Sequence, residues 1–95
     1  MRVKRRLDWT KTAQRQYLEQ LAWIAERNAV AASAAQRRIE HSLELIQSHP
    51  GIGTPDKRKR RRHPVPRTPF TLYYRVKRSS IQILRVLHQR QNPAD

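Results

Sequence analysis

The sequence predicts an α+β fold in a single domain, residues 1–95, with an N-terminal strand, an antiparallel helical hairpin and then a three-stranded antiparallel meander. Changes in the spacing of apolar residues indicate this order. Apolar residues alternate with charged ones before Thr10, recur every three or four positions as far as Ile46, and alternate again from Phe70. A length of 95 residues suits one small domain with a thin margin of stability.

The first strand is expected over Arg2–Trp9, where Val3, Leu7 and Trp9 share one face. Thr10 can then cap a helix, because its hydroxyl can accept a hydrogen bond from a backbone N–H of the first turn. Residues at helical spacing in this segment are Ala13, Tyr17, Leu21, Ile24 and Asn28. The last of these is expected to separate the first helix from a second one.

The second helix is expected over Val30–Ser48, where one stripe of the surface is apolar. The stripe comprises Ala32, Ala35, Ile39, Leu43 and Ile46. Pro50 and Gly51 then end the helix, since proline cannot continue it and glycine favours the turn that follows. The short connection between the two helices predicts an antiparallel hairpin.

Six consecutive cationic residues, Lys57–Arg62, follow the hairpin. We expect Lys57–Arg60 to form a loop, and Arg61 and Arg62 to enter the first strand of the meander. The second strand places Phe70, Leu72, Tyr74 and Val76 on one face, with Tyr73 on the other. The last strand, Ile81–His88, has Ile81, Ile83 and Leu87 on one face and Leu84 and Val86 on the other, which predicts a central position in the sheet.

The composition is strongly basic, with 21 Lys and Arg against 7 Asp and Glu and a formal charge of +14. Such a charge favours contact with anions, either nucleic acid or an acidic protein. The absence of cysteine excludes disulfides, and His41, His49 and His63 lack the spacing of metal ligands, so neither a metal nor a cofactor is expected. Without a signal sequence or a long apolar stretch, a cytoplasmic protein with no membrane partner is expected.

Several segments together resemble the RelE/ParE superfamily of bacterial type II toxins. They are "HPGIG" (His49–Gly53), "TPF…YYRV" (Thr68–Val76) and "ILRVLHQR" (Ile83–Arg90), in this order and spacing. The resemblance covers most of the chain and implies a sheet packed on a helical hairpin. It also implies a cognate antitoxin, commonly with an acidic tail, and contact with operator DNA only through the complex with that antitoxin.

The superfamily divides by target, because RelE-like members cut mRNA on the ribosome and ParE-like members inhibit DNA gyrase. The ribonuclease set would here be Arg62, His88 and Arg90, with His88 as the base. Thr71 stands where RelE-like enzymes carry another catalytic arginine. The segment "RVLHQR" and the alanine-rich second helix resemble the ParE-like branch, so the resemblance favours a gyrase inhibitor over an enzyme.

The resemblance and the charge together suggest two contact surfaces. The residues expected to bind the target or another polyanion are Lys57, Arg58, Lys59, Arg60, Arg61, Arg62 and Arg75. Those expected to bind the antitoxin are Trp23, Tyr17 and Arg27, since aromatic and arginine side chains often anchor interfaces. Two alternatives to gyrase inhibition stay open, a ribosome-dependent mRNA endoribonuclease and a non-toxic, basic nucleic-acid-binding protein.

Overall fold

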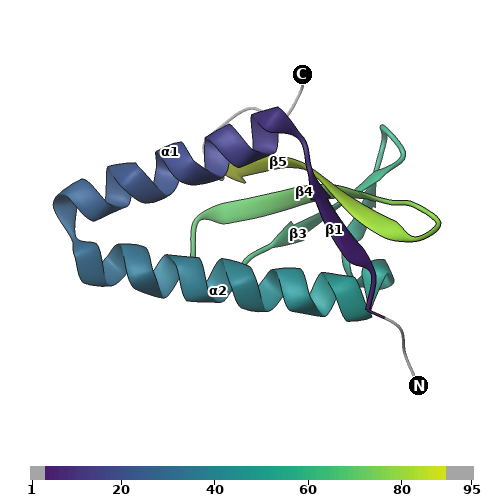
Figure 1. The fold of residues 1–95 in the computed structure, drawn as a ribbon, viewed down its shortest axis with the longest axis horizontal. Helices are drawn as coiled ribbons and strands as arrows, with labels where there is room; N and C mark the ends of the chain where they lie inside the picture. The colour runs from purple at the N-terminus through teal and green to yellow at the C-terminus, as the bar shows by residue number, and fades with distance from the viewer. Residues whose placement is uncertain (1–3, 90–95) are drawn as a thin grey trace.

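A five-stranded sheet forms the centre of the computed structural model, which describes residues 4–89 (Figure 1). Its strands lie in the order β1 (Arg6–Trp9), β5 (Ser80–His88), β4 (Phe70–Val76), β3 (Arg60–Pro64) and β2 (Thr54–Asp56). The four strands from β2 to β5 are antiparallel neighbours, and β1 runs parallel to β5. The predicted α+β class is confirmed.

Two helices, α1 (Lys11–Arg27) and α2 (Ala29–Ser48), form the predicted hairpin. The Thr10 hydroxyl accepts a hydrogen bond from the Ala13 N–H at 3.0 Å, which confirms the expected cap. Asn28 ends α1 and also begins α2, because its side-chain oxygen accepts from the Ala31 N–H at 2.9 Å. One residue therefore makes the turn between the helices.

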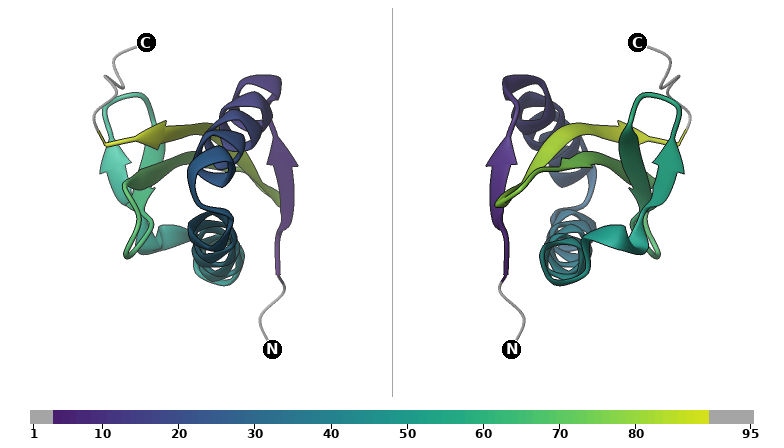
Figure 2. Two further views of the ribbon diagram at one scale, coloured as in Figure 1. Left: turned by 90° about the vertical axis from the view of Figure 1, so that its left-hand side faces the viewer. Right: turned by 90° about the vertical axis from the view of Figure 1, so that its right-hand side faces the viewer.

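Both helices pack on the same face of the curved sheet, as the two side views in Figure 2 show. The buried residues between the helices and the sheet come from α1, from α2 and from the segment between Val65 and Val86. They are Ala13, Ala35, Ile39, Leu43, Ile46, Val65, Phe70, Leu72, Tyr74, Ile81, Ile83 and Val86. The predicted stripe of α2 contributes most of its members to this core, so the helical pattern identified the packing face correctly. No helix within residues 4–89 is long and apolar enough to cross a membrane.

The N-terminal strand is shorter than expected, since β1 begins at Arg6; residues 2 and 3 of the expected strand lie outside the described part of the chain. Leu7 and Trp9 still pack against the core as predicted. The strand pairs with β5 and the Thr10 N–H donates to the Ile83 carbonyl at 3.1 Å, so that β5 lies between β1 and β4. The central position predicted for the last strand is confirmed.

The antiparallel part of the sheet has one strand more than the predicted meander. Strand β2 was not expected, and it pairs with β3 through Thr54–Arg62, Pro55–Arg61 and Asp56–Arg60. A strand of three residues that contains a proline gives almost no alternating pattern, which is why the sequence did not reveal it. The loop leaving the hairpin is therefore the tight turn of a β2–β3 hairpin, residues 57–59.

A β-bulge changes which side chains of β5 face the helices. Tyr73 pairs with Arg85 whereas Tyr74 pairs with Ile83, so Leu84 is an extra residue on β5. Before the bulge Ile81 and Ile83 face the core, and after it Val86 does. The expectation that Leu84 and Val86 share a face opposite to Ile81, Ile83 and Leu87 is thus wrong, because strict alternation does not survive an inserted residue. On β4, Val76 is 38% exposed rather than part of the core.

The end of α2 is fastened to the sheet by a buried tyrosine. After α2 a short 3₁₀ helix, η1 (Pro50–Ile52), leads to Gly53. The Tyr74 hydroxyl accepts a hydrogen bond from the Gly53 N–H at 2.9 Å and donates one to the Pro50 carbonyl at 2.6 Å. A Cβ on Gly53 would lie 2.4 Å from that hydroxyl, so only glycine fits. The "HPGIG" segment therefore binds the Tyr74 hydroxyl through its backbone. Burial raises the pKa of that hydroxyl.

Candidate partner-binding surfaces

The basic turn, Lys57–Lys59, projects from the tip of the β2–β3 hairpin with all its side chains exposed. The Lys57 N–H donates to the Asp56 carboxylate at 2.6 Å, which fixes the start of the turn. Lys59 has φ of 56°, a left-handed conformation that side chains other than glycine adopt at a cost. This turn can present positive charge to an anionic partner.

Arg60 does not belong to that exposed loop, and its expected placement there is wrong. It is the first residue of β3 and is 8% exposed. Its Nε donates to the Asp56 carboxylate at 2.7 Å, while its guanidinium lies 4.6 Å from the ring centroid of Tyr73. The hydrogen bond from Arg60 lowers the pKa of Asp56 below its usual value. Arg60 therefore ties the hairpin to the sheet, and the sequence missed this ion pair.

The other arginines of the basic run point to opposite faces of β3. Arg61 lies on the helix side and donates to the carbonyls of Gly51 and Gly53, at 3.3 and 2.7 Å. Arg62 is exposed, and it pairs in register with Tyr73, whose side chain lies on the face away from the helices. Arg75 is also exposed, near the end of β4. Of Arg61, Arg62 and Arg75, the last two are exposed and can present their charge to a partner.

The face of the sheet away from the helices carries a shallow pocket of about 360 Å³. Its lining residues are Thr54, Arg62, Pro64, Thr71, Tyr73, Leu87, His88 and Gln89. The structure thus brings together Arg62 and His88, two members of the expected ribonuclease set, whereas Arg90 lies outside the described residues. Thr71 lines the same pocket and offers a hydroxyl but no charge. The His88 ring packs edge-on against Phe70, with centroids 5.9 Å apart.

The expected antitoxin surface divides into two parts along α1. Trp23 is 59% exposed, and the Arg27 guanidinium covers its ring at 3.7 Å while donating to the Trp23 carbonyl at 2.8 Å. Tyr17 instead turns toward the core and packs on Trp9, with ring centroids 5.3 Å apart. Burial raises the pKa of Tyr17, so its phenol stays neutral. Trp23 and Arg27 form one exposed cluster to which Tyr17 does not belong.

A sequence model of the family described as "ParE toxin of type II toxin-antitoxin system, parDE" matches residues 7–93. The chain belongs to this family of ParE toxins. It is 34% identical over 94 residues to "Toxin ParE1" of Caulobacter vibrioides, covering 96% of this chain and 85% of that protein. A solved structure described as "Chromosomal ParDE TA system from P. aeruginosa" is also similar. Its TM-score is 0.78 at 26% identity, over 90% of this chain and 96% of that chain.

These matches confirm the resemblance to ParE-like toxins and favour a toxin over a non-toxic nucleic-acid-binding protein. A toxin of a type II toxin–antitoxin system has an antitoxin partner, as the ParDE assembly of the structural relative illustrates. Within residues 4–89 no three His, Asp or Glu side chains gather as metal ligands.

Sequence reasoning missed several exposed features of the toxin. Leu18 on α1 and Val30 on α2, 59% and 79% exposed, add apolar area to the surface of the helical hairpin. They lie outside the apolar stripes, and that position off the stripe was the available signal. A second basic region, around Arg38 and Arg67, was also missed because its residues are 29 positions apart in the sequence (67 − 38).

Proposed function

We propose that this toxin acts by binding DNA gyrase and poisoning it, without catalysing a reaction of its own. The observation that carries the proposal concerns Thr71, which occupies the sequence position of a catalytic arginine in RelE-like enzymes. Thr71 lines the pocket on the sheet face away from the helices, together with Arg62 and His88. Stabilising the charge on a phosphorane requires positive groups aimed at it, and a hydroxyl supplies far less. Membership of the ParE family supports the same conclusion.

The basic turn and the exposed arginines of the sheet suit contact with gyrase or with the DNA that gyrase holds. Lys57 and Lys59 extend from the tip of the β2–β3 hairpin, and Arg62 and Arg75 are exposed on the sheet. Arg58 and Arg61 belong to the same basic segment and Arg60 supports it from below. Charge on such a surface steers association with a polyanion and holds it in register.

The antitoxin is proposed to silence the toxin with an acidic tail that contacts Trp23 and Arg27. A formal charge of +14 favours an acidic partner, and an exposed aromatic with a neighbouring arginine is a common interface anchor. The tail would leave the DNA-binding part of the antitoxin free, so operator DNA would be reached only through the complex. Tyr17, being turned toward the core, would support this surface from beneath.

Gyrase inhibition can be tested with purified gyrase and the full-length toxin in a supercoiling assay. The variant Lys57→Gln/Lys59→Asn removes two exposed charges, and asparagine tolerates the left-handed backbone of the second position. The matched control, Lys11→Gln/Arg78→Gln, removes the same charge from exposed positions elsewhere. We expect the first variant to inhibit at least about tenfold more weakly and the control to match the wild type. A toxin that leaves supercoiling unchanged would refute the proposal.

A ribosome-dependent ribonuclease is the second candidate, because Arg62 and His88 line one pocket. An imidazole could take the proton of a 2′-hydroxyl while the guanidinium faced the phosphate. The test is mRNA cleavage by ribosomes with the wild type and with His88→Ala, which should lose about a hundredfold or more if His88 is the base. Cleavage by the wild type together with an inactive His88→Ala would replace the gyrase proposal with this one.

A further inference from the structure

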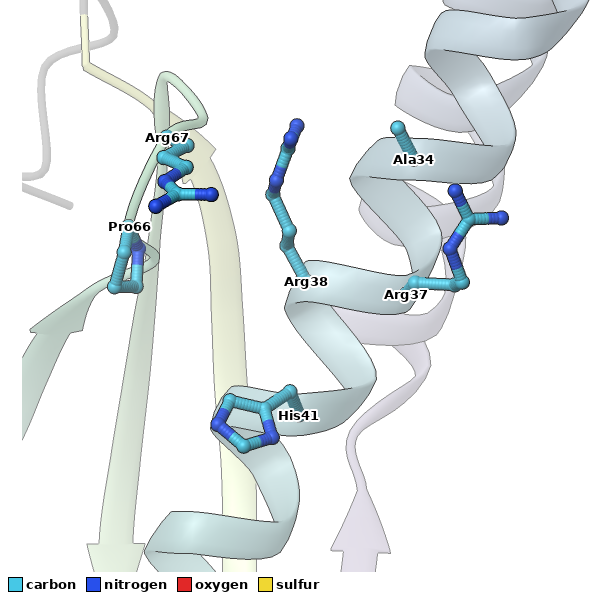
Figure 3. Close-up of a pocket in the computed structure, with 6 residues that line it drawn as sticks. All are labelled: Ala34, Arg37, Arg38, His41, Pro66 and Arg67. Atoms are coloured by element: carbon cyan, nitrogen blue, oxygen red, sulfur yellow. The ribbon is translucent and has the colours of Figure 1, made fainter.

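A cleft of about 410 Å³ lies between α2 and the turn that joins β3 to β4, in the second basic region, around Arg38 and Arg67 (Figure 3). Its lining residues are Ala34, Arg37, Arg38, His41, Pro66 and Arg67. In Figure 3 the Arg67 side chain points from the turn toward α2, and the Arg38 side chain extends from α2 into the space between the two, with His41 one turn along the helix. The cleft follows the last residue of β3, at the opposite end of that strand from the basic turn.

The positive charge of this cleft is not balanced by any negatively charged side chain among its lining residues. Three guanidinium groups and one imidazole line it, and no carboxylate does. Within residues 4–89, Arg37, Arg38 and Arg67 have no ion-pair partner. Like charges gathered in this way repel one another, so the arrangement costs free energy until an anion occupies it.

The turn that carries Arg67 is held rigidly. Val65 is 1% exposed and its N–H donates to the Phe70 carbonyl at 2.9 Å. The Thr68 hydroxyl donates to the Val65 carbonyl at 2.9 Å and accepts from the Phe70 N–H at 3.1 Å. Arg67 itself has φ of 62°, a left-handed conformation that is unfavourable for a residue with a Cβ. Strained residues of this kind are concentrated at binding sites, where the surrounding structure holds them in place.

We propose that this cleft is a binding site for a phosphate group. A guanidinium fork donates two parallel hydrogen bonds to a phosphate or a carboxylate. A single arginine suffices for a planar carboxylate, whereas the oxygens of a phosphate point in several directions and can accept from arginines on opposite walls. Arg38 on α2 and Arg67 on the turn provide such opposed forks, with Arg37 and His41 at the margin. The site goes beyond gyrase inhibition and does not depend on it.

The phosphate could belong to the backbone of a nucleic acid or to a small phosphate compound, and the test separates these sources. Purified full-length toxin is titrated with a fluorescent DNA duplex of about 20 base pairs at several salt concentrations, and with pyrophosphate by calorimetry. A polyglutamate peptide serves as a carboxylate probe. The test variant is Arg38→Gln/Arg67→Gly, since glycine accepts the left-handed backbone and keeps the turn intact. Lys11→Gln/Arg78→Gln is again the control of equal charge.

We expect the test variant to bind the duplex at least about tenfold more weakly than the control, with the slope of log K against log salt reduced by about 2. If pyrophosphate also binds the wild type and not the test variant, the site takes free phosphate compounds; duplex binding alone assigns it to a nucleic-acid backbone. Equal binding by the test variant and the control would overturn the proposal. A loss of polyglutamate binding as large as the loss of duplex binding would also overturn it, because the cleft would then be a general anion site. Circular dichroism verifies that each variant is folded.

Discussion

Replacing Tyr74 with phenylalanine removes one oxygen atom and two hydrogen bonds from the centre of the fold. The ring is fully buried, so the apolar packing stays the same. The lost hydroxyl leaves the Gly53 N–H and the Pro50 carbonyl without the partners that they have at 2.9 and 2.6 Å. The substitution therefore isolates the contact that fastens the end of α2 to the sheet.

The cost of Tyr74→Phe can be worked out from these two bonds. A typical hydrogen bond contributes about 0.5–1.5 kcal/mol net, and a buried group left unsatisfied costs about 1–3 kcal/mol. Since water can reach part of the η1 segment, we expect a loss of about 2–3 kcal/mol in the free energy of unfolding. For a domain of this size that corresponds to a fall in melting temperature of about 8–24 °C.

The neighbouring Tyr73 supplies a matched control. It is 7% exposed, and its hydroxyl forms no hydrogen bond to another residue within 4–89, so Tyr73→Phe should change stability by less than about 0.5 kcal/mol. Urea unfolding followed by circular dichroism measures both variants. Equal stabilities for the two variants would refute the reasoning, because the Tyr74 hydroxyl would then contribute nothing beyond its ring.

Four further predictions concern single positions. Lys59→Gly should raise the free energy of unfolding by about 1 kcal/mol, measured by urea unfolding, because glycine relieves φ of 56°. Burial lowers the pKa of His63 below 6.5, so the unfolded state takes up a proton at a higher pH than the folded state. The free energy of unfolding therefore falls as pH drops through 6.5, and His63→Gln should flatten this fall between about pH 7.5 and pH 5. The Arg60 hydrogen bond lowers the pKa of Asp56, so the stability that the ionised Asp56 provides is complete above pH 3.8 and is lost as pH falls further. Asp56→Asn should remove that part of the acid unfolding curve. Trp23→Ala should weaken antitoxin binding at least about tenfold by calorimetry while changing stability by less than about 1 kcal/mol.

Most of the fold could be predicted from the sequence because the helices and long strands bury one clear face each. The stripe from Ala32 to Ile46, the cap at Thr10 and the break between the helices at Asn28 are local signals that the structure confirms. The central position of β5 followed from apolar residues on both of its sides. These patterns depend on short-range spacing, which the sequence displays directly.

Features that depend on contacts between distant residues could not be predicted in this way. The bulge at Leu84 is one inserted residue, and it reverses the face of every later residue of β5. Strand β2 is too short to show alternation, so Arg60 was assigned to a loop although it forms an ion pair with Asp56 across the hairpin. The cleft at Arg38 and Arg67 exists only because a rigid turn places one arginine over a helix that carries the other.

The parallel pairing of β1 with β5 has a consequence for the order of folding. Residues 6–9 find their partners at residues 80–83, so the sheet closes only after most of the chain has been made. The helical hairpin depends on local contacts and can form early, whereas closing so long a loop is slow. Until the last strand docks, the Leu7 and Trp9 side chains lack their sheet neighbours. During synthesis the toxin therefore passes through an interval in which its helices, with Trp23 and Arg27, exist and the binding surfaces of its sheet do not.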